Sequence, residues 1–154
     1  MATKEYFPGI EKIKFEGKDS KNPMAFRYYD AEKVINGKKM KDWLKFAMAW
    51  WHTLCAEGGD QFGGGTKQFP WNGENNPVQA AKNKMDAGFE FMQKMGIEYY
   101  CFHDVDLVTE ADTIDGLPGK MDPLLTLQPA PEKMHRVSLQ SIITHLLNLP
   151  ETIR

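Results

Sequence analysis

The stretch NPVQAAKNKMDAGFEFMQKMGIEYYCFHDVD, Asn76–Asp106, decides the fold of this chain. Its apolar residues recur at spacings of three and four, which is the period of one buried face of an α-helix. These positions are Val78, Ala81, Met85, Phe89, Met92 and Met95. Asn76 can cap the start of the helix, Pro77 suits its first turn, and Gly96 can end it in the left-handed conformation. The sequence therefore predicts a helix from 77 to 95.

The segments on either side of this helix predict strands. Ile97–Phe102 is apolar or aromatic on both faces, as in a strand buried in a parallel sheet. Upstream, the composition predicts a short helix at about 39–45 that runs into a buried strand at about 46–53. A long glycine-rich loop, 56–76, follows, and loops of that length are usually functional or disordered. Strand, loop, helix and strand make a βαβ unit, which predicts an α/β fold with a parallel sheet, a right-handed crossover and chemical groups at the carboxyl ends of the strands.

The two ends of the chain lack such periodicity. Residues 1–39 contain several turn signals and many aromatic side chains, and they predict an irregular N-terminal arm that packs onto the rest of the fold. From residue 116 the chain is rich in proline, with one amphipathic run at 138–149 that could form a three-turn helix. The length of 154 residues by itself suits one ordinary domain.

Composition argues against several classes of function. The net charge of −2 provides no basic field for nucleic acid or for an anionic membrane. The longest apolar stretches are far shorter than the roughly 20 residues that cross a bilayer, and the N-terminus lacks the apolar core of a signal peptide. We therefore expect a cytoplasmic protein without nucleic-acid or membrane partners. The two cysteines, Cys55 and Cys101, have no C-x-x-C spacing and predict buried free thiols. The glycines at 63–65 fit no nucleotide-binding loop.

A histidine and a carboxylate follow the second predicted strand, at His103 and Asp106. An imidazole there can exchange a proton near neutral pH, and a carboxylate three residues further on can accept its other ring N–H. The alternative is that His103 is a satisfied core residue while Asp104 and Asp106 cap the next helix. The spacing His-x-x-Asp is a weak pattern, and by itself it favours this alternative.

Trp50 and Trp51 lie at the end of the first predicted strand. Tryptophans in such a run are more often core residues than ligand contacts. An indole at the carboxyl end of a strand nevertheless makes a flat apolar platform suited to a sugar ring. The residues alone leave both possibilities open.

Three segments, taken in order, resemble the N-terminal part of the longer-chain class of xylose isomerases. They are FAMAWWHTLCAEGGDQF at Phe46–Phe62, followed by Gly63, then KMDAGFEFMQKMG at 84–96 and YCFHDVDL at 100–107. The resemblance extends from about residue 3 to about residue 115. It implies an incomplete (β/α)₈ TIM barrel in which 1–115 is the N-terminal portion, with 1–39 as its arm, and 116–154 is a divergent tail.

The resemblance also implies an activity. It points to an aldose–ketose isomerase, a homotetramer in the intact family, that interconverts D-xylose and D-xylulose by ring opening and a metal-assisted hydride shift. His103 matches the family's ring-opening histidine and Asp106 the carboxylate that orients it. Trp51 matches the tryptophan that walls the sugar site, and Phe62 the aromatic that reaches into a neighbouring subunit's active site.

The family uses two divalent cations, Mg²⁺, Mn²⁺ or Co²⁺, which prefer carboxylate oxygens. No residue of this chain matches a metal ligand, and we assign no such role to Asp122, Glu132 or His135. A complete barrel needs about 250 residues, so we expect this truncated chain to be inactive alone. Two alternatives are a non-catalytic fragment that binds intact isomerase subunits through the arm and the Phe62 loop, and a sugar-binding remnant.

Overall fold

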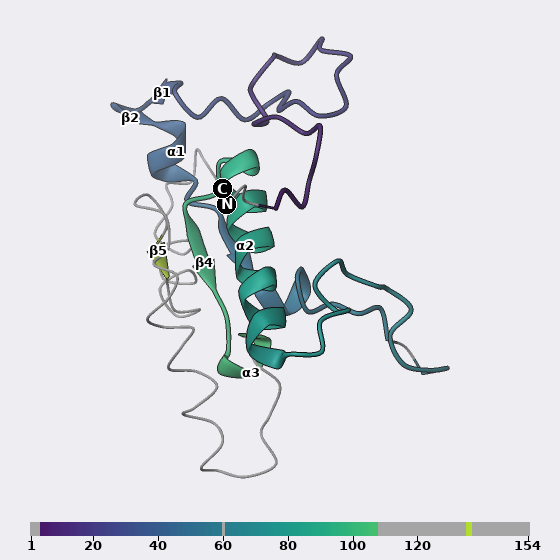
Figure 1. The fold of residues 1–154 in the computed structure, drawn as a ribbon. Coiled ribbons are helices and arrows are strands. Elements are labelled where there is room, and N and C mark those ends of the chain that lie inside the picture. The colour runs from purple at the N-terminus through teal and green to yellow at the C-terminus, as the bar shows by residue number, and fades with distance from the viewer. Residues whose placement is uncertain (1–3, 60, 108–134, 137–154) are drawn as a thin grey trace.

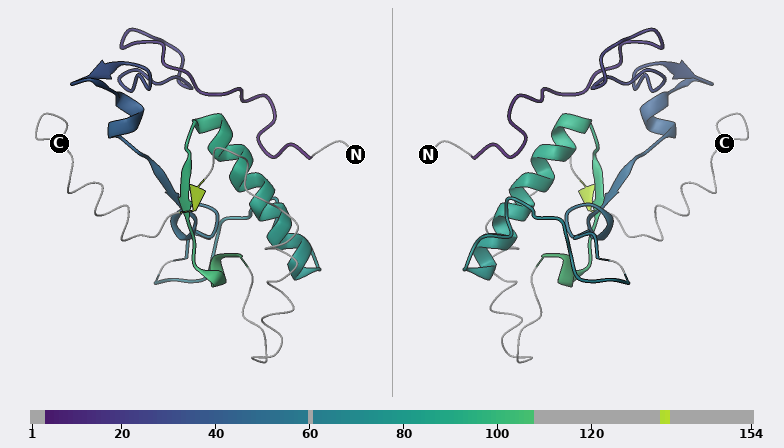
Figure 2. Two further views of the ribbon diagram at one scale, coloured as in Figure 1. Left: turned by 90° about the vertical axis from the view of Figure 1, so that its left-hand side faces the viewer. Right: turned by 90° about the vertical axis from the view of Figure 1, so that its right-hand side faces the viewer.

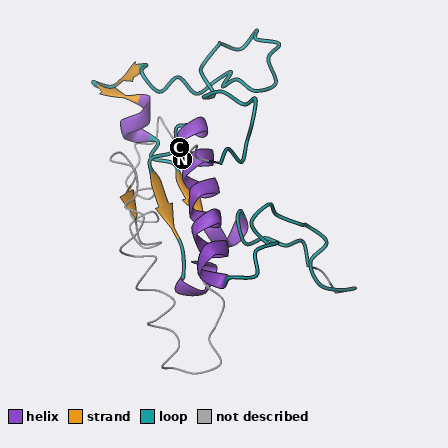
Figure 3. Ribbon diagram, in the orientation of Figure 1, coloured by secondary structure: helices purple, strands orange, loops and turns teal. Residues whose placement is uncertain are grey.

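The computed structural model describes residues 4–59, 61–107 and 135–136, and Figure 1 shows their arrangement. Two short sheets are present, an antiparallel pair β1-β2 and a parallel sheet in the order β3-β4-β5. The strands are β1 (Val34–Ile35), β2 (Lys38–Lys39), β3 (Ala47–Ala49), β4 (Tyr99–Cys101) and β5 (His135–Arg136). The helices are α1 (Met40–Trp43), the 3₁₀ turn η1 (Trp50–His52), α2 (Pro77–Met95) and α3 (Asp104–Leu107). The predicted α/β class is confirmed (Figure 3).

Helix α2 has the bounds and caps that the sequence predicts. The Asn76 side-chain oxygen accepts the backbone N–H groups of Val78 and Gln79 at 2.9 and 3.2 Å. At the other end Gly96 has φ 71°, and its N–H donates to the carbonyl of Gln93. Both sets of contacts satisfy helix-end groups that would otherwise have no partner.

Strands β3 and β4 are parallel, with Ala47 opposite Tyr99 and Ala49 opposite Cys101. The predicted βαβ unit is therefore confirmed. Both strands are shorter than expected, however, and the prediction of a strand across Trp50–Thr53 is wrong. There the N–H groups of Thr53 and Cys55 both donate to the carbonyl of Trp50. These local hydrogen bonds turn the chain into η1 and take it out of the sheet.

A third parallel strand, β5, pairs with the other side of β4, with Tyr99 opposite His135 and Tyr100 opposite Arg136. These positions belong to the proline-rich tail, for which the sequence predicts no strand. Apart from β5, residues 116–154 and the helix predicted at 138–149 lie outside the described residues.

Figure 2 shows helix α2 lying alongside the strands β3 and β4. Between the helix and the sheet lies a core of buried apolar side chains that includes Trp50. Trp50 and Met92 are fully buried, and the Trp50 ring lies 5.9 Å from the ring of Phe89. The close approach depends on Gly88, because a Cβ there would lie 2.8 Å from Leu54 Cδ1 and 3.1 Å from Trp50 Cζ2. Within the described ranges, no helix is long and apolar enough to cross a membrane.

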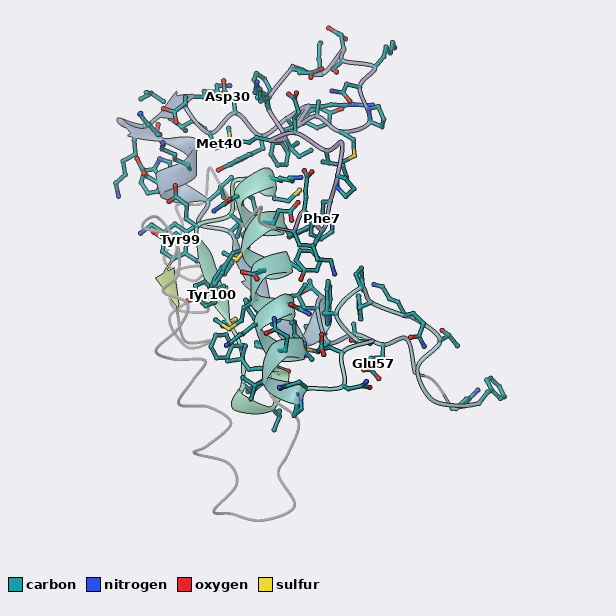
Figure 4. The ribbon with its side chains drawn as sticks, in the orientation of Figure 1. Phe7, Asp30, Met40, Glu57, Tyr99 and Tyr100 are labelled. Carbon is teal, nitrogen blue, oxygen red and sulfur yellow. The ribbon has the colours of Figure 1, made fainter. Side chains whose placement is uncertain are left out.

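The arm packs onto α2, as its aromatic residues predict. The ring of Phe7 lies 5.8 Å from that of Phe91, and the Glu90 carboxylate accepts the N–H groups of Tyr6 and Phe7 at 2.7 and 3.0 Å. Figure 4 labels Phe7 in the arm and Tyr99 and Tyr100 on β4. The short hairpin β1-β2 was not anticipated. Its turn residues Asn36 and Gly37 have φ 50° and 78°, as two-residue hairpin turns require.

Candidate functional site

The carboxyl ends of β3 and β4 lie side by side because the two strands are parallel and in register. The residues that follow them, Trp51 in η1 and His103 before α3, are thereby brought together. Their ring centroids are 4.6 Å apart, with the planes inclined by 42°. Figure 1 shows α3 at the end of β4. Parallel-sheet proteins place their chemistry at this edge.

Asp106 makes two hydrogen bonds to His103 through one carboxylate oxygen. Its Oδ2 accepts the backbone N–H of His103 at 2.6 Å and lies 3.1 Å from the ring Nδ1. The Asp106 side chain is 7% exposed and that of His103 is 64% exposed. When Nδ1 carries the proton that Asp106 accepts, Nε2 is left with its lone pair and can act as a base.

The alternative interpretation of these residues is half right. Asp106 does cap α3, because it accepts the N–H of the residue that precedes the helix. The prediction that His103 is a core residue is wrong, since its side chain lies largely in solvent. One carboxylate oxygen thus serves both the helix start and the imidazole.

The two adjacent tryptophans have different environments. Trp50 is fully buried and belongs to the core. Trp51 is only partly buried, and its ring contacts those of His103 and His52, with the His52 centroid 5.6 Å away. The core interpretation is therefore confirmed for Trp50, whereas the platform interpretation stays a prediction for Trp51, which lies partly exposed beside His103.

A lysine for which the sequence predicts no role, Lys84, contacts the backbone of Asp106. Lys84 Nζ donates to the backbone carbonyl of Asp106 at 2.8 Å, and Cys55 Sγ donates to the same oxygen at 3.3 Å. Burial raises the pKa of the Cys55 thiol, the Asp106 charge raises it further, and the nearby Lys84 charge opposes the shift. In the sequence, Lys84 occupies the polar face of α2 and gives no signal that distinguishes it from a solvated lysine.

Both cysteines are free, as predicted, although only Cys101 is buried and Cys55 is partly exposed. Phe62 is 87% exposed and belongs to the loop 56–76, which extends away from the sheet in Figure 1. The base of this loop closes through a hydrogen bond from Lys67 N–H to the carbonyl of Glu57 at 2.9 Å. Gly65 is required there, because a Cβ would lie 2.6 Å from that of Glu57.

The described part of the chain does not fit a divalent cation. Within 4–59, 61–107 and 135–136, no group of three or more His, Cys, Asp and Glu side chains could hold a metal ion. Asp122 and Glu132 lie outside the described residues, and His135 is described only as backbone in β5.

A cavity of about 290 Å³ lies at the opposite end of β4. It is lined by residues of the arm, of α1, of the end of α2 and of the start of β4, including Tyr29, Lys41, Met95 and Tyr99. His103, Asp106 and Trp51 are not among its lining residues. The cavity is therefore separate from the site at the carboxyl ends of the strands.

Comparison with known proteins finds close relatives, although no protein-family model matches the chain. A xylose isomerase of Bacteroides fragilis is 85% identical over 125 residues, which are 81% of this chain and 28% of the relative. The xylose isomerase of Phocaeicola vulgatus is 91% identical over 115 residues, 75% of this chain and 26% of the relative. The xylose isomerase of Bacteroides thetaiotaomicron is 88% identical over 115 residues, again 75% of this chain and 26% of the relative. The chain thus spans about a quarter of the length of the curated relatives it matches.

Proposed function

We propose, on the premise that this chain is closely similar to xylose isomerases over about three quarters of its length, that it forms part of an aldose–ketose isomerase. Residues 40–107 would be the first βαβ unit of an incomplete (β/α)₈ barrel, and 1–39 its arm. The parallel order β3-β4-β5 and the packing of α2 on this sheet support the assignment. Barrel enzymes place their active residues at the carboxyl ends of the strands.

One observation carries the proposed chemistry: an exposed imidazole that is oriented by a buried carboxylate, 3.1 Å away, and flanked by an indole ring at 4.6 Å. His103 Nε2 would accept the proton of the anomeric hydroxyl of D-xylose as the bond from C1 to the ring oxygen breaks. The ring oxygen takes up a proton, which the imidazolium can return. Asp106 holds Nδ1–H throughout, and Trp51 offers a flat apolar wall to the sugar.

The described residues account for ring opening and for no later step of the proposed reaction. The conversion of D-xylose to D-xylulose needs hydrogen transfer between C1 and C2, and we assign this step to no residue of this chain. The two divalent cations expected from the resemblance, Mg²⁺, Mn²⁺ or Co²⁺, do not fit the described residues, so we derive no step through them. The exposure of Phe62 supports its proposed reach into a neighbouring subunit of a homotetramer.

A chimaeric enzyme tests the proposal. The segment of the Bacteroides fragilis xylose isomerase that matches this chain over 125 residues is replaced by the segment from this chain, and turnover of D-xylose with Mg²⁺ is measured. We expect turnover, and we expect His103→Gln to lower kcat by about 10²-fold or more, the usual contribution of a positioned acid–base group. His52→Gln, which changes a neighbouring histidine, serves as the matched control. An assembled chimaera whose kcat is the same with His103 and with Gln contradicts the proposal.

The isolated chain provides a second test. We expect no metal-dependent interconversion of D-xylose and D-xylulose, because no residue of this chain matches a metal ligand of the family that it resembles. Measurable Mg²⁺-stimulated turnover that is abolished by His103→Ala would overturn this expectation.

A second candidate function is a non-catalytic chain that binds isomerase subunits, which the exposed Phe62 favours. Thermal unfolding distinguishes it from a sugar-binding remnant. A rise in Tm on mixing with a full-length isomerase, lost in Phe62→Ala, supports the binding function. A rise with xylitol alone supports the sugar-binding remnant.

A further inference from the structure

Helix α3 cannot hold Asp106 in place by itself. It comprises the four residues Asp104–Leu107, whereas isolated helices shorter than about 12–15 residues are marginal in water. Yet the Asp106 carboxylate must stay within hydrogen-bond distance of the His103 ring to orient it. The position of Asp106 therefore depends on contacts with the rest of the fold.

Two such contacts are present: one is made by the next residue, Leu107, and the other by the carbonyl oxygen of Asp106. Leu107 is buried in the core, which anchors the end of α3. The carbonyl oxygen of Asp106 accepts hydrogen bonds from Lys84 Nζ at 2.8 Å and from Cys55 Sγ at 3.3 Å. Lys84 belongs to α2, a helix of 19 residues with both ends capped, so its donor projects from a rigid element.

The lysine is the stronger of the two donors. A charged ammonium group makes stronger hydrogen bonds than a neutral donor, whereas a thiol is a weak donor. Lys84 Nζ also lies 3.7 Å from Cys55 Sγ, and the ion pairs found among the described residues do not include Lys84. The partners shown for its ammonium group are thus the Asp106 carbonyl and the adjacent sulfur.

We infer that Lys84 is a positioning residue for His103 and acts through the backbone of Asp106. By holding the Asp106 carbonyl, it keeps Oδ2 at the Nδ1 of His103 and keeps the imidazole in the tautomer that carries its proton on Nδ1. The Nε2 lone pair is then available as the base. The catalytic consequence of this inference rests on the proposed function. The test, in contrast, measures the tautomer of the His103 ring and needs no turnover.

The ring ¹⁵N chemical shifts of His103 report the tautomer directly. They are measured on the full ¹⁵N-labelled chain at about pH 9, where imidazoles are neutral, and assigned by their loss in His103→Gln. Lys84→Met keeps the length of the side chain and removes its donors. We expect it to lose the Nδ1–H signature in favour of a mixture of tautomers, and we expect Lys84→Arg to restore it.

Lys82→Met is the matched control, because it makes the same change two residues earlier on α2, whereas the hydrogen bonds found to the Asp106 carbonyl come from Lys84 and Cys55. Lys82→Met should leave the ring ¹⁵N shifts of His103 unchanged. The ring shifts of His52 should be unchanged in both Lys82→Met and Lys84→Met. If Lys84→Met gives the same His103 tautomer as the unmodified chain, the inference is wrong.

A second measurement covers the case in which Lys84→Met does not fold. In the unmodified chain, labelled with ¹⁵N and ¹³C, the hydrogen bond should give a scalar coupling between Lys84 Nζ and the carbonyl carbon of Asp106. Absence of that coupling overturns the inference. The proposed function fails separately, if His103→Gln leaves the turnover of the chimaeric enzyme unchanged while the tautomer still depends on Lys84.

Discussion

The arm, residues 4–39, and the βαβ unit, residues 40–107, are held by different forces. Inside the unit, α2 meets the sheet through apolar side chains, of which Trp50 and Met92 are fully buried. The arm contacts the same helix through aromatic rings and through polar contacts with two residues of α2, Glu90 and Lys94. We call this pair of residues the latch. Besides its ion pair with Glu90 at 2.8 Å, Lys94 accepts the N–H of Ile13 on its carbonyl at 2.7 Å.

This difference indicates which of the two regions should lose stability when the pH changes. Burial of apolar surface does not depend on the protonation of any group, whereas the latch works through an ionised carboxylate. A change that opens the unit must also release the arm, because the arm packs on α2. A change in the latch should release the arm and leave the unit folded.

The largest effect is expected from Trp50→Ala. It removes the fully buried ring that contacts Phe89 and Tyr100, and large-to-small changes of this kind cost about 3–5 kcal/mol. The free energy of unfolding from denaturant titration measures the loss. Near-normal stability would show that the unit is not held by this core.

Gly88→Ala tests the same interface by adding atoms. The new Cβ would lie 2.8 Å from Leu54 Cδ1 and 3.1 Å from Trp50, and overpacking costs about 1–3 kcal/mol. Gly73→Ala is the matched control, since a Cβ at Gly73 meets nothing within 4 Å. The prediction fails if both variants unfold at the same denaturant concentration.

Glu90→Gln breaks the latch alone. Burial raises the pKa of Glu90, but hydrogen bonds from Lys94 and from the N–H groups of Tyr6 and Phe7 outweigh it and hold the pKa below the ordinary value of 4.5. Because the folded pKa is the lower one, the stabilisation is complete above pH 4.5 and is lost as the pH falls below it. We expect the substitution to lower the free energy needed to detach the arm from α2 by about 1–2 kcal/mol.

Hydrogen exchange of the Tyr6 and Phe7 amides measures this attachment. In the unmodified chain their protection should fall in acid, and in Glu90→Gln it should be weak at every pH. Amides in α2 serve as the internal control and should remain protected. Equal loss of protection in the arm and in α2 would mean that the two regions are not separable.

The smallest effect is expected from Glu32→Gln in the arm. Hydrogen bonds with Lys39 and Lys41 lower the pKa of Glu32 to about 2, but all three side chains are exposed. Exposed ion pairs are screened by water and add little to stability. We expect no measurable change in Tm, and a clear drop would show that surface charges do contribute to holding the arm.

The parts of the fold that could be predicted are those with local causes. The bounds of α2 follow from Asn76, Pro77 and Gly96, whose side chains and backbone angles act on their own neighbours in the chain. The pairing of β4 with β5 could not be predicted, because the partners are more than thirty residues apart and the pattern around His135 and Arg136 carries no strand signal.

The candidate site shows the same division. His103 and Asp106 are three residues apart, so a short turn can bring them together, and the residues and the resemblance to xylose isomerases led to them. Lys84 was missed, because its only distinguishing feature is a contact across 22 positions to a backbone carbonyl. Side-chain patterns carry no information about which carbonyl a lysine will meet.

The sequence by itself determined one long capped helix, a parallel βαβ unit around it, and the chemical groups at the ends of the strands. Only the tertiary structure decided which of two adjacent tryptophans enters the core and which lies beside His103. The physical reason is that β3 stops at Ala49, where hydrogen bonds to the carbonyl of Trp50 turn the chain. Packing against Gly88 then takes Trp50 inside and leaves Trp51 at the edge of the sheet.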